Sequence, residues 1–502
     1  MSKILALPHS IISKIEAKNS PFFYFLFVFF FSIVVRNFLE VITYREIKLS
    51  DWYAHMHYST YYLALVGWII ILLKVFVKEK TETIAKVVLT FMPIIIICPI
   101  IDFGVHQFAD FHQVLGYLSP ELHGNFFSQY FLFFGNHIGE KLGPSIGYRI
   151  EVLFVLIGLA IYIWVKTENL IKAFLGFLAL YTLIYFFCST PYVLKNFLGL
   201  SPYSPQLVPY YLLLTLISGL LIFYSNFKKE TLILIKDFRW LRLGFYELIF
   251  LFGLVYGLTN GGIIKASIIY QGVFTLIAIA FSWKYAVMIN NLEDLKIDAV
   301  SNPSRPLLQN FNTSFYKTIS WWVLAISMVF SLYADVVIWQ FITIFSLNYF
   351  IYSAEPLRLK RIPILSKLPI AVNILLLFLL GNIYVGNNTS NIPNEIIWFI
   401  IIGGTFALNV IDIKDFEGDK KAGIKTLPVL IGLKPAKFIL GITFLVGHLL
   451  GFLFTDSSTT YFVLVGLGIL QLIFITSKKY SDSKVVGTFL IAILITALEK
   501  FF

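Results

Sequence analysis

Residues 290–306 read NNLEDLKIDAVSNPSRP and directly follow a long apolar run. Within this stretch, Asn290, Asp294 and Asp298 are spaced by four residues. On a helix, that spacing places the three oxygen-bearing side chains on one face. A row of oxygen ligands at the end of a membrane span can hold a hard divalent cation, and Mg²⁺ usually brings a phosphate group with it. The stretch therefore predicts a magnesium-phosphate site at a membrane surface.

A second acidic stretch, residues 412–425, reads DIKDFEGDKKAGIK and repeats the pattern. Asp415 and Asp419 are four residues apart, and Asp412 adds a third acid beside them. Carboxylates repel an organic diphosphate, so binding needs bridging Mg²⁺ ions, and the remaining phosphate oxygens need cations. Together the two stretches predict one magnesium-diphosphate site. Either stretch taken alone is also typical of solvated loop carboxylates.

The composition is that of a membrane protein. Of the 502 residues, 58% are hydrophobic and only 13% are charged, which is more apolar surface than a soluble domain needs. The apolar segments are long and continuous, which favours helices over the short alternating strands of a barrel. Basic cytoplasmic loops and contacts with lipid headgroups explain the formal net charge of +11. We therefore expect membrane lipid, and no nucleic acid, as a partner.

These features predict an all-α polytopic membrane protein with about fifteen transmembrane helices. We expect an N-terminal domain at residues 1–234 with about six spans and a second domain at residues 235–502 with about nine spans. A charged connector, residues 226–242, separates them. The expected spans are 21–42, 60–77, 84–101, 147–165, 170–188 and 207–224 in the first domain, and 243–258, 263–289, 319–334, 337–352, 368–385, 396–411, 438–454, 459–476 and 485–499 in the second.

The predicted topology brings three polar stretches to one face of the cell membrane. Lysine and arginine cluster on alternate connections, on the side of the basic N-terminus, which predicts that this side is cytoplasmic. The second, fourth and sixth spans of the second domain end there, carrying the two acidic stretches and the connection 351–361, IYSAEPLRLKR. The first domain has no motif of known chemistry, so its role and any protein partner stay open.

Basic residues and one tyrosine near these stretches are candidates for binding the diphosphate. Positive-inside bias alone could account for each cation. Tyr352 could hydrogen-bond a phosphate or an acceptor, although tyrosine is also common where a span meets water. The candidate cations are Arg305, Arg358, Lys360, Lys421 and Lys425.

These motifs give the second half a resemblance to the UbiA-type intramembrane prenyltransferase superfamily, over roughly residues 235–500. Asn290, Asp294 and Asp298 are similar to its first motif, Asn-x-x-x-Asp-x-x-x-Asp, and residues 302–306 resemble the sequence that follows it. Asp415 and Asp419 are similar to its second motif. Residues 418–432 and 351–361 resemble the branch that makes chlorophyll, tocopherol-like and archaeal lipid products.

The resemblance implies a nine-helix fold and a magnesium-dependent prenyl transfer. An isoprenyl or polyprenyl diphosphate would ionise toward an allylic cation, which a lipophilic or aromatic acceptor attacks. The Mg²⁺ ligands implied are Asn290, Asp294, Asp298, Asp415 and Asp419. This chain departs from the family pattern at Asn291, where many members carry aspartate, and at Glu355, where proline is common.

Two alternatives stay open from the sequence alone. A cation-coupled transporter or a lipid-binding membrane protein would also carry acidic motifs, although transporters commonly place functional charges near the bilayer midplane. The acids here lie at the ends of expected spans. A non-catalytic scaffold is the other alternative, and the four aspartates of the two motifs disfavour it.

Overall fold

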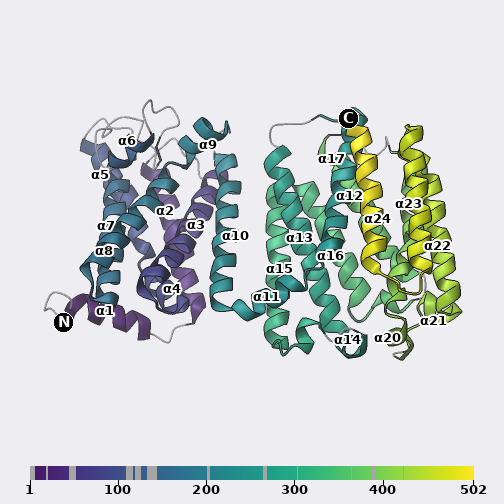
Figure 1. Cartoon of the computed structure of the whole chain (residues 1–502). Coiled ribbons are helices and arrows are strands. Elements are labelled where there is room, and N and C mark those ends of the chain that lie inside the picture. The colour runs from purple at the N-terminus through teal and green to yellow at the C-terminus, as the bar shows by residue number, and fades with distance from the viewer. Residues whose placement is uncertain are drawn as a thin grey trace. The chain divides into compact units, whose positions relative to one another are not determined.

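The computed structural model describes residues 6–17, 21–43, 52–108, 117–118, 126–132, 144–199, 204–263, 268–301, 304–362, 365–386, 392–421 and 423–501. All regular secondary structure in these ranges is helical. The chain divides into two compact units, Met1–Lys228 and Lys229–Phe502, and each is described by itself (Figure 1). The assignment of separate roles to two domains stays a prediction.

The first unit contains six helical segments that are long and apolar enough to cross a membrane, as expected. The third of them is interrupted, because Pro93 opens a short 3-10 helix between α4 and α5. The helices of this unit are α1 (Ala6–Ala17), α2 (Phe22–Thr43), α3 (Trp52–Val77), α4 (Thr81–Thr90), η2 (Met92–Ile96), α5 (Ile97–Phe108), α6 (Phe126–Phe131), α7 (Ile146–Thr167), α8 (Leu170–Cys188), α9 (Thr190–Leu198) and α10 (Ser204–Asn226).

A buried ion group joins the spans of the first unit. Arg36 of α2 lies 3.0 Å from Glu40 and 2.5 Å from Glu151 of α7, and all three side chains are almost fully buried. The guanidinium also donates a hydrogen bond to the carbonyl of Ile95 in the interrupted span. Removing one partner would leave an uncompensated buried charge, so this group fixes how α2, α7 and the interrupted span pack.

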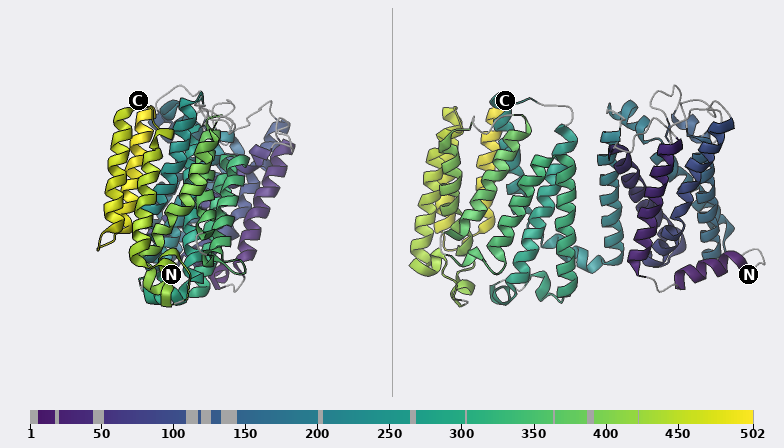
Figure 2. Two further views of the ribbon diagram at one scale, coloured as in Figure 1. Left: turned by 90° about the vertical axis from the view of Figure 1, so that its right-hand side faces the viewer. Right: turned by 180° about the vertical axis from the view of Figure 1, so that it is seen from behind.

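The second unit is a bundle of membrane-length helices with short helices at one end. In Figure 1, α14 and α20 lie at that end and the C-terminus lies at the other, and both views of Figure 2 agree. Its main helices are α11 (Lys228–Lys236), α12 (Trp240–Thr259), α13 (Ile268–Glu293), α14 (Leu295–Ser301), α15 (Thr313–Ala334), α16 (Val336–Ser353), α17 (Leu368–Tyr384), α20 (Phe416–Lys421), α21 (Leu427–Ile431), α22 (Leu433–Leu449), α23 (Ser458–Thr476) and α24 (Asp482–Phe501). Short 3-10 helices accompany them, including η3 (Pro306–Leu308), η4 (Leu359–Arg361), η5 (Leu365–Lys367) and η9 (Leu450–Leu453).

Thirteen segments of the described chain meet the length and composition of a membrane span, against about fifteen expected. The difference comes from two helices of the second unit. Helix α17 is mostly apolar but has only 17 residues, and α24 carries charged residues at both ends. Helices this close to the span length can cross with modest bilayer adjustment, so the fifteen expected segments all appear as helices.

The sixth span of the second unit is irregular. It consists of α18 (Asn394–Trp398), a π-helical turn η7 (Phe399–Gly403), α19 (Gly404–Ala407) and a 3-10 helix η8 (Leu408–Ile413). Such departures from α-helical geometry are common near functional sites. Here the irregular helical turns lead into the second acidic stretch, whose first residue, Asp412, lies in the last turn of η8.

The topology predicts that residues 304 and 420 face the same side of the membrane. Ser304 follows α14 and Lys420 lies on α20, and both are exposed. In the full chain with Cys98 and Cys188 replaced by serine, Ser304→Cys and Lys420→Cys should react equally with a membrane-impermeant thiol reagent from the cytoplasmic side. Asp456→Cys, in the turn between α22 and α23, should react only from the other side. Labelling of residues 304 and 420 from opposite sides would exclude a shared site.

Candidate active site

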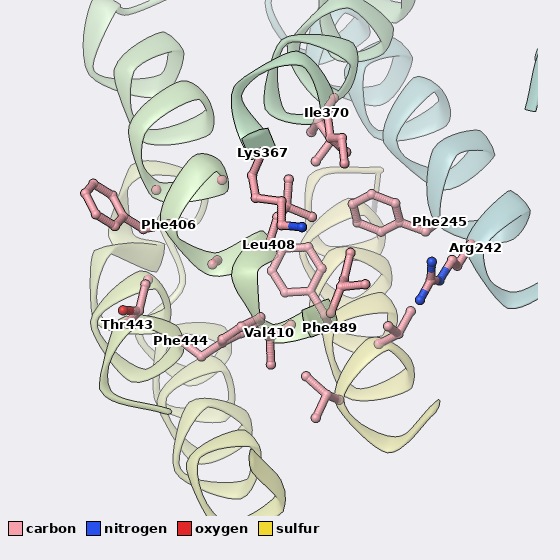
Figure 3. Close-up of a pocket in the computed structure, with 18 of the residues that line it drawn as sticks. Arg242, Phe245, Lys367, Ile370, Phe406, Leu408, Val410, Thr443, Phe444 and Phe489 are labelled. Atoms are coloured by element: carbon pink, nitrogen blue, oxygen red, sulfur yellow. The ribbon is translucent and has the colours of Figure 1, made fainter. Parts of the chain in front are cut away.

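A cavity of about 1020 Å³ opens within the second unit. One end is lined by charged residues in or beside α12, α14, η3, η4, η5, η8 and α20, and the remainder mostly by apolar side chains of the membrane-spanning helices. Figure 3 shows Arg242 and Lys367, from different elements, beside the aromatic rings of Phe245 and Phe489. The cavity therefore joins a cluster of charges to an apolar interior. The polar residues gathered at this end are Arg239, Arg242, Asn290, Asp294, Asp298, Arg305, Tyr352, Lys360, Lys367, Asp412, Lys414, Asp415 and Asp419, and other polar side chains of the lining include Glu395, Thr443, His448 and Thr496.

The first acidic motif crosses a break between two helices. Helix α13 ends at Glu293 and α14 begins at Leu295. The backbone amide of Asp294 still donates to the carbonyl of Asn290 at 2.9 Å, and that of Asp298 donates to the carbonyl of Asp294 at 2.8 Å. The four-residue register expected for one helix is therefore kept through the break, and all three side chains line the cavity.

Asp294 is surrounded by donors from two other segments. Asn290 Nδ2 donates to its Oδ2 at 2.7 Å, and the Arg358 guanidinium donates to its Oδ1 at 3.0 Å. Lys360 forms an ion pair with the same oxygen. Burial lowers the pKa of the Lys360 ammonium, while Asp294 opposes that shift. Two predicted phosphate cations therefore lie against a predicted metal ligand.

The second acidic motif gathers three carboxylates with one close cation. The amide of Asp419 donates to the carbonyl of Asp415 at 2.8 Å, and Asp412 Oδ1 accepts from Lys367 at 2.6 Å. Asp412 Oδ2 is buried and has no hydrogen-bond partner. Burial and the neighbouring Asp412 and Asp415 raise the pKa of Asp419 to about 7. Helix α14 packs against α20, so the two acidic motifs are neighbours in space.

This donor set fits a Mg²⁺ ion that arrives with a diphosphate. Among the described residues, no group of three or more carboxylate, imidazole or thiol side chains is close enough to hold a metal alone. Mg²⁺ commonly uses one or two carboxylates together with substrate phosphates, so a site complete without substrate is not required. The unpartnered oxygen of Asp412 and the raised pKa of Asp419 indicate surplus negative charge that a cation would satisfy.

Four cavity cations lay outside the candidates named from the sequence. Arg239, Arg242, Lys367 and Lys414 line the polar end, yet in the sequence they look like ordinary positive-inside residues. Arg239 has a φ of 55°, which lies in the left-handed region that residues other than glycine rarely adopt. Burial, with Arg305 and Arg242 nearby, lowers its pKa to about 10. Like charges brought together at a strained backbone are typical of a site built for an anion.

The remaining sequence candidates divide into two groups. Arg305 and Tyr352 line the cavity, and Arg358 reaches it through Asp294. Lys421 and Lys425 are exposed and do not line the cavity, so their role as phosphate ligands stays a prediction.

The unusual residue Glu355 pairs with two arginines, and one of them, Arg358, also contacts Asp294. Its carboxylate lies 2.9 Å from Arg361 and 3.4 Å from Arg358, and the Glu355 and Arg361 side chains are about half exposed. Glu355 does not line the cavity. Solvent screens this half-exposed carboxylate, so its influence on the first acidic motif is exerted mainly through Arg358.

Residues 248–493 match the model of the UbiA prenyltransferase family. This part of the chain is a UbiA prenyltransferase domain. It lies within the second unit and contains both acidic motifs and the middle connection.

Related proteins match the UbiA domain over part of their lengths. Digeranylgeranylglyceryl phosphate synthase of Methanothrix thermoacetophila is 30% identical over 169 residues, which is 33% of this chain and 60% of that protein. Chloroplastic chlorophyll synthase of Oryza sativa subsp. japonica is 31% identical over 205 residues, 38% of this chain and 54% of that protein. A solved structure of a UbiA homolog from Archaeoglobus fulgidus, bound to GPP and Mg²⁺, has a TM-score of 0.42 and 21% identity, covering 53% of this chain and 98% of that one.

Proposed function

We propose that this protein is an intramembrane prenyltransferase, which moves an isoprenyl or polyprenyl group from its diphosphate to a lipophilic or aromatic acceptor. The observation that carries the proposal is the single cavity that joins two acidic motifs and a group of cations to an apolar interior. A prenyl diphosphate has the matching shape and charge, with a multiply charged head and a long apolar tail. Membership of residues 248–493 in the UbiA family and the names of the relatives support the same activity.

The polar end would bind the diphosphate. Asp294, Asp298, Asp415 and Asp419 would hold Mg²⁺, with Asn290 orienting the first pair. When bound, the metal ions would neutralise charge on the leaving diphosphate. Arg239, Arg242 and Arg305 line the same end and would bind the remaining phosphate oxygens. These cations stabilise the charge that develops as the C–O bond breaks, which lowers the barrier to ionisation.

The apolar part of the cavity would hold the prenyl group. Its wall includes the aromatic rings of Phe245, Tyr246, Trp283 and Tyr349, which lie near the charged end. The negative faces of such rings stabilise a neighbouring cation, and the same packing excludes water that would quench an allylic cation. The acceptor would attack the cation and then lose a proton.

The proposed site faces the cytoplasmic side of the cell membrane. The basic connections on that side and the shared end of α14 and α20 support this orientation. The lipophilic acceptor would enter from the membrane, where the helices around the cavity are exposed to lipid.

The experiment that tests the function is prenyl transfer by the purified full chain in lipid nanodiscs. The protein is incubated with labelled geranylgeranyl diphosphate, Mg²⁺ and a panel of acceptors that includes a glycerol-phosphate lipid, an aromatic quinone precursor and a tetrapyrrole acid. We expect a labelled product with at least one acceptor, and none when EDTA replaces Mg²⁺. Binding of cations without diphosphate binding or transfer would favour the transporter alternative.

We predict that the second unit is sufficient for diphosphate binding, because all cavity residues lie in it. A fragment starting at Asn226 should bind Mg²⁺ and diphosphate with a Kd within about threefold of that of the full chain. Isothermal titration of both proteins in nanodiscs measures this, with thermal unfolding as the control for folding. A folded fragment that binds no diphosphate would mean that the first unit helps to build the site.

A further inference from the structure

The cavity cation Arg305 is held by a carboxylate that belongs to neither acidic motif. Asp237 lies between α11 and α12, its side chain is 7% exposed, and it is not among the residues that line the cavity. Its Oδ1 accepts a hydrogen bond from Arg305 at 3.0 Å. Lys284 lies 3.6 Å from its Oδ2 and also donates to the carbonyl of Leu234 at 2.9 Å, which anchors the connector.

Asn291 connects this carboxylate to a second cavity cation. Its Nδ2 donates to Asp237 Oδ2 at 2.7 Å and to the Tyr316 hydroxyl at 2.9 Å, while its Oδ1 accepts from Arg239 at 3.0 Å. Asn291 is 1% exposed. The amide therefore uses its donors and its acceptor in one buried network. A carboxylate at position 291 could not donate, and it would place two negative charges in contact.

Arg305 in turn lies between the connector and the first acidic motif. Its guanidinium is hydrogen-bonded to Asp237, and its Nε is 3.7 Å from Asp298 Oδ2. A guanidinium fixed in this way is already oriented at the cavity wall, so less rotational freedom is lost when it binds an anion. The network therefore orients the guanidinium groups of Arg305 and Arg239 before a phosphate group binds.

On the basis of the proposed function, we propose that Asp237 is a positioning residue for the diphosphate, and that Asn291 is the neutral bridge this arrangement requires. Asp237 acts directly on Arg305 and, through Asn291, on Arg239. Arg305 and Arg239 would hold the phosphate oxygens before as well as during ionisation, so loss of Asp237 should weaken diphosphate binding more than it slows the chemical step. It also places the connector that follows the first unit in contact with the binding site.

The test is an exchange of the two side chains in the full chain. The variants are Asp237→Asn, Asn291→Asp and the double exchange Asp237→Asn/Asn291→Asp, with Asp456→Asn as the control that removes an exposed carboxylate outside the cavity. Asp237→Asn should raise the KM for the prenyl diphosphate about tenfold, with kcat within about threefold. Asn291→Asp should raise KM further and lower the melting temperature, because two buried carboxylates then meet. The double exchange restores one carboxylate and one amide and should return KM to within about threefold of wild type.

Two results would overturn the inference. One is a purely structural pattern, in which the single variants lower melting temperature and kcat while KM is unchanged. The other is a double exchange no better than the worse single variant. Binding of inorganic diphosphate with Mg²⁺, measured by titration calorimetry, separates this inference from the proposed function. If wild type binds diphosphate but transfers no prenyl group, and affinities follow the same order, only the proposed function fails. If wild type binds no diphosphate, the inference fails as well.

Discussion

Asp294→Asn and Asp415→Asn should each lower prenyl transfer at least about a hundredfold, a loss of transition-state stabilisation of roughly 3 kcal/mol. Both side chains line the charged end of the cavity, one from each acidic motif. An amide keeps the size and one oxygen of the side chain but removes the negative charge, and a hard cation such as Mg²⁺ then loses much of its affinity. The measurement is turnover against Mg²⁺ concentration for each variant.

The matched control is Asp456→Asn, which makes the same chemical change at a carboxylate that is 92% exposed and paired with Lys500. Its turnover should equal that of wild type. Lys360→Ala should cost less than either aspartate variant, because Arg239, Arg242 and Arg305 also face the cavity. Near-normal turnover of both aspartate variants at low Mg²⁺ would contradict the magnesium-diphosphate site and favour a transporter.

Thermal unfolding separates the two aspartate variants. Asp294 is the counter-ion of Arg358 and Lys360, whose side chains are only 12% and 9% exposed. Neutralising it leaves those cations close together without their acid, so Asp294→Asn should lower the melting temperature more than Asp415→Asn does. The sequence places Asp294 at the end of an expected span, near water, which predicts a small loss of stability. The ion pairs seen in the structure predict a larger one.

The acidic motifs were predictable because chemistry and periodicity coincide there. Four-residue spacing of Asn290, Asp294 and Asp298 survives the break between α13 and α14, since the backbone hydrogen bonds continue across it. Counting apolar runs also placed both acidic stretches at one end of the bundle, where α14 and α20 are packed together. These inferences depend on residue spacing and on the fact that successive connections lie on alternate sides of the membrane. Both can be obtained from a single sequence.

The cations were harder to assign because charge in a membrane protein has two causes. Arg239 and Arg242 lie at the start of α12, where the positive-inside rule alone predicts basic residues. Only the three-dimensional structure separates them from Lys421 and Lys425, which are exposed outside the cavity. The buried contacts of Asn291 could not be predicted from the sequence either, because its partners Asp237 and Tyr316 are far from it along the chain.

Gly253→Ala and Gly381→Ala should each destabilise the second unit by about 1–3 kcal/mol, the cost of overpacking a close contact. Gly253 of α12 and Gly381 of α17 lie where the two helices meet. A Cβ at Gly253 would be 2.1 Å from the carbonyl oxygen of Phe378, and one at Gly381 would be 2.1 Å from that of Phe250. The obstacle is backbone in both cases, so no side-chain rotation can relieve it, and the helices must separate. Small residues permit such close approach between membrane helices.

The control for this prediction is Gly244→Ala, in the same helix α12, where a Cβ would have no neighbour within 4 Å. It should be neutral or stabilising by up to about 1 kcal/mol, because alanine favours a helix over glycine. Thermal unfolding of the full chain in one detergent measures all three variants. Activity should fall with the two close-contact variants as well. Arg242 lies on α12 and Lys367 immediately precedes α17, so separating these helices displaces cations at the charged end of the cavity. Equal melting temperatures for Gly244→Ala and Gly381→Ala would contradict the close packing of α12 on α17.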